Sequence, residues 1–279
     1  VLDVGKSLCC LYGGRYSSVQ QLREAIQGKT YPAPSCPWIG VPTTAGTGSE
    51  TTCWATIWDP ENNAKYSIDT PQNYAYAAVA DPELLYSMPI GLAVSSALDA
   101  AAHAAESYWA KASNLVSKSL AVSAIQQIMG QIGVLLDDPE NAPAHDAMSK
   151  GSMLAGLAFS NTRTTACHSL SYPLTMRYHI PHGAAVAILL APVMQFNRQA
   201  GFDPAPLLRA FGVDNERELG RKIETMLTRA GLPARLSGWG AKQSDIAELA
   251  KHSITKGRAD NNPAQITVDA AAGVLASLL

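Results

Sequence analysis

The sequence predicts a two-part fold, with an α/β part over residues 1–88 followed by an all-helical part over residues 89–279. Two observations carry this prediction. Stretches with the alternation of a strand occur only before residue 88, among turn-forming residues. From Pro89 onward, apolar residues recur at helical spacing and no strong strand pattern interrupts them. We therefore place a domain boundary near residue 88.

The first part is expected to alternate helices with short strands. One helix reaches Leu11, and a second runs from a Ser17 or Ser18 N-cap to Ile26, ahead of Gly28. Strand-like segments are predicted at 38–41, 53–58, 65–68 and 76–80. A loop rich in glycine and hydroxyl groups, Thr43–Glu50, follows the first of these strands, and hydroxyls of this kind can bind a phosphate or a ribose.

The second part is expected to be a series of helices joined by short loops. Their periodicity and end signals predict helical segments at 91–110, 115–136, 143–159, 165–177, 183–197, 205–211, 215–230, 243–251 and 266–278.

Composition narrows the possible locations and partners. With 47% hydrophobic and 16% charged residues in 279, the chain can bury a large core. A net charge of -2 gives no general attraction to nucleic acid or to acidic membranes, so we expect neither as a partner. The five cysteines lack CxxC spacing, and no signal peptide is visible. These features predict a reducing, cytoplasmic location.

Polar residues interrupt an alanine-rich helix over residues 96–108. Asp99 and His103 are four residues apart and so share one helical face. In a packed interior they need partners, and a metal ion with His168 and His182 as further ligands would supply them. Such a nitrogen and oxygen set suits Fe(II) or Zn(II). A local hydrogen bond and ordinary helix caps stay open as the alternative, because spacing alone does not show that the segments converge.

Arginine and hydroxyl side chains lie close to one of these histidines in the sequence. Arg163 and Thr164 precede His168 by five residues or fewer, and a guanidinium binds phosphonate, phosphate or carboxylate through two parallel hydrogen bonds. Arg177 and Arg258 are further candidates for the same anion site. A surface charge is the alternative for each arginine.

Several short motifs occur together in one order. They are Pro-Thr-Thr-Ala-Gly-Thr-Gly-Ser-Glu at 42–50, Asp81-Pro82, Asp99-x-x-x-His103-x-x-Glu106, and His168 ahead of Pro181-His182-Gly183. In this order the chain resembles the iron-containing (group III) alcohol dehydrogenases, over most of its length up to about residue 200. The resemblance implies a dehydroquinate synthase-like architecture. It also implies a metal, Fe(II) or Zn(II), bound by Asp99, His103, His168 and His182.

The resemblance further implies a nicotinamide cofactor, NAD(H) or NADP(H), in the cleft between the two domains. It places Thr43, Thr44, Thr47 and Thr52 near that cofactor, and Asp3 and Lys65 near its nicotinamide half, although Lys65 reads equally well as a solvated lysine of a strand. The family's Gly-Gly-Gly-Ser turn, which cradles the pyrophosphate, would fall just before Val1. The cofactor-binding part is therefore expected to be incomplete here, within a longer native chain. A homodimer is also implied.

The implied activity is metal-dependent, NAD(P)H-linked reduction of an aldehyde. The segment from Arg163 to Thr175 is similar to the phosphonoacetaldehyde reductase branch, which makes 2-hydroxyethylphosphonate. Tyr172 stands where many family members carry a second histidine, so Tyr172 and Arg163 are the catalytic candidates. The alternatives are a simple alcohol or lactaldehyde reductase, an acidic-sugar 8-oxidase, a dehydroquinate synthase-type lyase, and a non-enzymatic relic.

Overall fold

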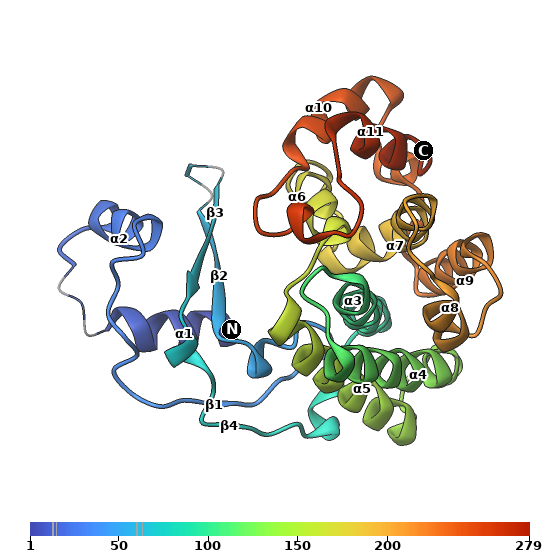
Figure 1. Cartoon of the computed structure of the whole chain (residues 1–279). Coiled ribbons are helices and arrows are strands. Elements are labelled where there is room, and N and C mark those ends of the chain that lie inside the picture. Colours follow the sequence, from blue (N-terminus) through green and yellow to red (C-terminus); the bar gives the residue numbers. More distant parts are fainter. Residues whose placement is uncertain (13, 15, 60, 63) are drawn as a thin grey trace. The chain divides into compact units, whose positions relative to one another are not determined.

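The computed structural model describes residues 1–12, 14, 16–59, 61–62 and 64–279 (Figure 1). The chain forms two compact units. The first holds Val1–Thr43 and Gly48–Asp81, and the second holds Thr44–Thr47 and Pro82–Leu279. The change of unit after Asp81 comes a few residues before the boundary predicted near residue 88.

Within its described residues, the first unit contains two α-helices and four short strands, as predicted. The helices are α1 (Leu2–Leu11) and α2 (Val19–Gln27), and the strands are β1 (Ile39–Gly40), β2 (Trp54–Asp59), β3 (Ala64–Asp69) and β4 (Ala77–Ala78). Strands β2 and β3 pair antiparallel, from Trp54 opposite Asp69 to Asp59 opposite Ala64. Strands β1 and β4 pair in parallel over two residues each, which is shorter than predicted. The Ser18 side chain caps α2 by accepting a hydrogen bond from Gln21 N.

A buried lysine lies at the centre of the contacts between α1 and β2. The Lys6 side chain is 0% exposed, and its Nζ donates to Thr52 Oγ1 and to the Trp54 carbonyl oxygen, both at 3.0 Å. The ammonium group lies 5.3 Å from the Trp38 ring centroid. Burial lowers the pKa of Lys6 to about 8, against the nearby carboxylates of Asp3 and Glu50, which raise it.

This lowered pKa makes the stability of the chain depend on pH. Below about pH 8 Lys6 is charged in both the folded and unfolded states, and the buried charge opposes folding. Between about 8 and 10.5 the folded protein releases the proton that the unfolded chain still holds, so stability rises with pH. We expect wild type to gain up to about 3 kcal/mol relative to Lys6→Met across this window. Urea unfolding of both proteins on either side of the window measures the difference; parallel changes would contradict the assignment.

The second unit is helical, and its helices begin and end within a few residues of the predicted positions. They are α3 (Ile90–Trp109), α4 (Leu115–Asp137), α5 (Ala142–Thr162), α6 (Ala166–Tyr178), α7 (His182–Gln199), α8 (Ala205–Phe211), α9 (Glu216–Arg229), α10 (Ile246–His252) and α11 (Val268–Ala276). The helix predicted from residue 243 starts as a 3₁₀ turn over Gln243–Asp245 before α10 continues it.

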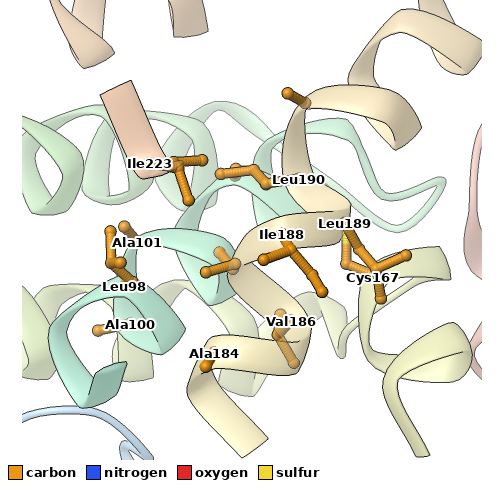
Figure 2. Packing of buried hydrophobic residues seen from close by; sticks show 14 of the residues in the cluster. Leu98, Ala100, Ala101, Cys167, Ala184, Val186, Ile188, Leu189, Leu190 and Ile223 are labelled. Atoms are coloured by element: carbon orange, nitrogen blue, oxygen red, sulfur yellow. The ribbon is translucent and has the colours of Figure 1, made fainter. Parts of the chain in front are cut away.

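Helix α3 lies in the middle of this unit and packs against α4, α5 and α7. Its alanines are buried on nearly every face, as expected for a helix that is apolar all round. Figure 2 shows Leu98, Ala100 and Ala101 of α3 beside Val186 and Ile188 of α7, in a cluster of buried side chains. Small side chains allow the helix backbones to approach closely, which places polar groups of α3 within reach of α6 and α7.

Helix α4 is long and apolar enough to cross a membrane, judged by length and composition alone. It packs on α3 and α5 with Ile125, Ile128 and Ile132 fully buried. A core helix of a folded unit meets the same criterion, so this feature is weak evidence for a membrane.

Candidate metal centre

Three of the predicted metal ligands meet inside the helical unit. Asp99 comes from the middle of α3, His168 from the first turn of α6, and His182 is the first residue of α7. Each offers one ligand atom, and these atoms all lie within 4.8 Å of one another. Asp99 and His168 are buried, while His182 is partly exposed. Segments far apart in the sequence thus supply one carboxylate and two imidazoles to one place.

The orientation of His168 is set by a second carboxylate. Its Nδ1 contacts Glu106 Oε2, and a carboxylate accepts, so Nδ1 carries the hydrogen. In that tautomer, Nε2 points its lone pair at Asp99 Oδ1, 3.4 Å away. Both atoms are buried, and neither forms a hydrogen bond of good geometry within the described part of the chain. Burial lowers the pKa of His168, but the carboxylates of Glu106 and Asp99 outweigh it and raise that pKa. Two acceptors that face each other in a buried site need a cation between them, which is either a proton on Nε2 or a metal ion, and one carboxylate with two imidazoles is a donor set that fits a metal ion.

The electrostatics of the site agree with this fit. Burial alone would raise the pKa of Asp99, but His103, His168 and His182 outweigh it and hold the pKa well below its usual range. Asp99 therefore stays ionised, the form that binds a metal.

Glu106 also fixes the start of α6. It is 0% exposed, and its Oε1 accepts from Cys167 N at 2.7 Å and from Thr165 Oγ1 at 2.8 Å. Trp109 Nε1 in turn donates to Thr165 Oγ1 at 2.7 Å. The carboxylate thereby accepts from a backbone N–H in the first turn of α6 that has no partner within the helix, and it orients the imidazole of His168. The same carboxylate accepts the imidazole N–H of His168 through its other oxygen.

His103 lies beside the cluster of three. Its ring stacks on Phe159 at 4.2 Å and on His168 at 4.3 Å between centroids. Its Nδ1 is 3.2 Å from the Gly46 carbonyl oxygen, which can only accept, so Nε2 keeps its lone pair. Burial lowers the pKa of His103 to about 3, which keeps the ring neutral. This is the form that a metal ligand needs, and the role of His103 as a fourth ligand stays a prediction.

Two glycines let the backbones around the site come into contact. A Cβ at Gly183, next to His182, would overlap the Ser95 carbonyl oxygen of α3 and lie 2.7 Å from its carbon. A Cβ at Gly46 would lie 2.8 Å from the Ser96 carbonyl oxygen. Both positions therefore require glycine because backbone, rather than a movable side chain, fills the space.

The predicted substrate residues are placed differently from one another. Arg258 Nη1 donates to Thr164 Oγ1 at 2.6 Å, and its charge lowers the pKa of Tyr172 while burial, the larger effect, raises it. The Tyr172 ring stacks on His182 at 6.2 Å between centroids. Tyr172 thus adjoins a candidate metal ligand, and Arg258 and Thr164 are linked to it through Tyr172.

Two other arginines have different surroundings. Arg163 is exposed at the C-terminal end of α5, with a φ of 63°, a conformation that side chains other than glycine rarely adopt. Arg177 is in the last turn of α6, at the opposite end of that helix from His168. Its Nη2 binds Asp245 Oδ1 at 2.8 Å, so it has a surface partner of its own.

The predicted cofactor residues are spread over both units. Asp3 accepts from Ser49 Oγ at 2.5 Å and from Thr56 N at 2.8 Å, and buried Thr52 donates to the Ser49 carbonyl oxygen. Thr43 and Thr47 are exposed, and Thr44 is half-buried. Lys65 lies in β3 opposite Trp58, but its side chain falls outside the described residues. The cofactor contacts of all six stay predictions.

Sequence reasoning missed three residues that shape these sites. Thr165 links Trp109 to Glu106, and Phe159 stacks on His103. Lys6 is buried against Thr52, one of the cofactor candidates. No local pattern marks any of them, because each acts through a partner more than forty residues away.

Comparison with known proteins identifies relatives of the whole chain. Residues 93–279 match the profile of the Fe-containing alcohol dehydrogenase family, C-terminal, and residues 1–82 match that of iron-containing alcohol dehydrogenase. Alcohol dehydrogenase 4 of Schizosaccharomyces pombe is 30% identical over 99% of this chain and 65% of its own length. The phosphonoacetaldehyde reductase of Streptomyces viridochromogenes is 29% identical over 95% of this chain and 70% of its own length.

A solved structure agrees with these matches. The sulfoacetaldehyde reductase of Bifidobacterium kashiwanohense, determined in complex with NAD⁺, has a TM-score of 0.89 at 29% identity. The match covers 99% of this chain and 73% of that one. The chain spans 65%, 45% and 63% of the length of three of the curated relatives that it matches.

Proposed function

Because this chain belongs to the iron-containing alcohol dehydrogenase family, we propose that it is part of a metal-dependent, NAD(P)H-linked reductase of a small anionic aldehyde. The observation that carries the proposal is the meeting of Asp99, His168 and His182, in which Asp99 Oδ1 and His168 Nε2 lie 3.4 Å apart in a buried site. These three residues, with His103, would hold Fe(II) or Zn(II). A bound metal would polarise the substrate carbonyl as a Lewis acid, and a bound nicotinamide would donate the hydride.

The chain's own residues would position and polarise the substrate. Glu106 keeps His168 in the tautomer that a ligand needs, and Phe159 holds the His103 ring by stacking. Burial raises the pKa of Tyr172, so its phenol keeps its proton and offers a hydrogen-bond donor rather than a base. Tyr172 is therefore suited to donate a hydrogen bond from its Oη to the substrate oxygen, and it would transfer its proton only to a strongly basic alkoxide formed during reduction.

Arg258 supports an anionic substrate. Its guanidinium lies against Thr164 and close enough to Tyr172 to lower the pKa of that phenol. A cation beside Tyr172, whose ring contacts His182, suits a phosphonate or sulfonate group, which a neutral alcohol would not use. The names of the two similar reductases, for phosphonoacetaldehyde and sulfoacetaldehyde, support the same class. Within it we favour phosphonoacetaldehyde, with 2-hydroxyethylphosphonate as the product.

Removing the Arg258 charge should change substrate preference. We expect Arg258→Ala to lower kcat/KM for phosphonoacetaldehyde by about 10- to 100-fold, the cost of one charge-assisted hydrogen-bonding partner. For propanal, which lacks the anion, the change should stay within about 3-fold. NADH consumption by the metal-loaded native protein measures both rates.

Other arginine variants complete this experiment. Arg258→Lys should recover part of the loss, and Arg163→Ala tests the exposed candidate. Arg177→Ala, whose partner is Asp245, is the control that should leave the preference unchanged. An unchanged preference in both Arg258→Ala and Arg163→Ala would point to a simple alcohol or lactaldehyde reductase.

Turnover without net NADH consumption would point to a lyase. The homodimer and the cytoplasmic location stay predictions.

A further inference from the structure

Two cysteines of the first unit lie side by side. Cys9 is in α1, Cys36 is in the segment before β1, and their Sγ atoms are 3.7 Å apart, with the Cys36 thiol donating to Cys9. The main chain holds this contact. The Cys9 carbonyl oxygen accepts from Ser35 N at 2.8 Å and from Ser35 Oγ at 3.2 Å. The pair therefore stays close even when a thiol changes rotamer.

Solvent access distinguishes this pair from the other cysteines. Cys36 is exposed and Cys9 is half-buried, whereas Cys10, Cys53 and Cys167 are buried. The Cys36 sulfur can therefore meet a dissolved oxidant while Cys9 lies directly behind it. Burial and the hydrogen bond from Cys36 raise the pKa of Cys9, which disfavours its thiolate.

We propose that Cys9 and Cys36 form a reversible disulfide when the protein meets a hydroperoxide, which makes the pair an oxidative modification site. The Cys36 thiolate attacks one peroxide oxygen, so a sulfur–oxygen bond forms, the oxygen–oxygen bond breaks, and the alcohol or water leaves with a proton. The Cys9 sulfur then attacks the Cys36 sulfur, the sulfur–sulfur bond forms, and water leaves with the Cys9 proton. The two thiols lose two electrons, and the peroxide accepts them.

The geometry allows this step with a small movement. A disulfide needs its sulfur atoms to come about 1.7 Å closer than in the present contact. Rotation of the exposed Cys36 side chain supplies that approach because the Ser35 backbone is already bound to Cys9. The cross-link would tie α1 to the segment that leads to Trp38, and both carry groups that contact Lys6. Oxidation would thus lock the surroundings of the buried lysine.

Mass spectrometry tests the proposal on the native protein. After hydrogen peroxide treatment we expect an intact mass lower by about 2 Da, two of the five thiols lost to Ellman's reagent, and full reversal by dithiothreitol. Chymotryptic cleavage after Trp38 separates Cys36 from Cys53. The joined peptides should then fragment to show Cys9, and not Cys10, bound to Cys36.

Two variants make the test decisive. Cys36→Ser, at an exposed position, should abolish the mass loss without affecting folding. Cys10→Ser, at the adjacent but buried thiol, should form the cross-link as wild type does. A Cys36 that stops at sulfinic acid, a bridge through Cys10, or a bridge between two chains would each overturn the proposal.

Discussion

Gly183→Ala should disrupt the candidate metal centre. The new Cβ would overlap the backbone of Ser95, so α7 must move away from α3. His182, the preceding residue, would move with it and leave Asp99. We expect a loss of about 3 kcal/mol or more in stability, typical of severe overpacking, together with loss of tight metal binding.

Urea unfolding and metal titration measure these two effects. Gly130→Ala in α4 is the matched control, because a Cβ there meets nothing within 4 Å. That variant should gain up to about 1 kcal/mol from helix propensity and bind metal normally. Wild-type metal affinity in Gly183→Ala would contradict the close contact of α7 with α3.

Glu106→Gln should separate folding from metal binding. The amide keeps the size of the carboxylate but carries only one acceptor oxygen. If that oxygen stays on Cys167 N and Thr165, the amide N–H₂ faces His168 Nδ1 and forces the hydrogen onto Nε2, the proposed ligand atom. If the amide flips, the start of α6 loses its acceptor. Either way we expect a 10- to 100-fold weaker metal affinity, as is usual when the outer partner of a ligand is changed.

The cost in stability should be smaller than the effect on the metal. We expect a loss of about 2 kcal/mol for the weakened buried network. Glu224→Gln, on the half-exposed surface of α9, is the control and should change neither quantity. Competition with a metal-binding dye, under anaerobic conditions for Fe(II), measures the affinity. Equal affinities for wild type and Glu106→Gln would show that the carboxylate does not orient a ligand.

Local signals predicted the helices well and the strands less well. Ser18 and Gly28 mark the two ends of α2 by side-chain and backbone capping, which depends only on nearby residues. The strands β1 and β4 have two residues each, because their extent depends on pairing with a distant partner. The 3₁₀ turn ahead of α10 differs from a helix in backbone geometry that the apolar pattern does not encode.

The sequence predicted the candidate site only in part. The spacing of Asp99 and His103 places them on one helix, but the meeting of Asp99 with His168 and His182 depends on how three helices pack. The sequence also ranked Arg163 above Arg258. Arg258 follows Thr164 by almost a hundred residues, so only the fold reveals their hydrogen bond.

The most direct test of the metal centre is the metal content of the native protein after anaerobic loading and desalting. We predict one Fe(II) or Zn(II) per chain in wild type, and less than about one tenth of that in Asp99→Ala and His182→Ala. His252→Ala, an exposed histidine paired with Glu248 on α10, should load as wild type does. Circular dichroism of each variant confirms that it is folded. Wild type without metal, or full loading of both ligand variants, would contradict the proposed site.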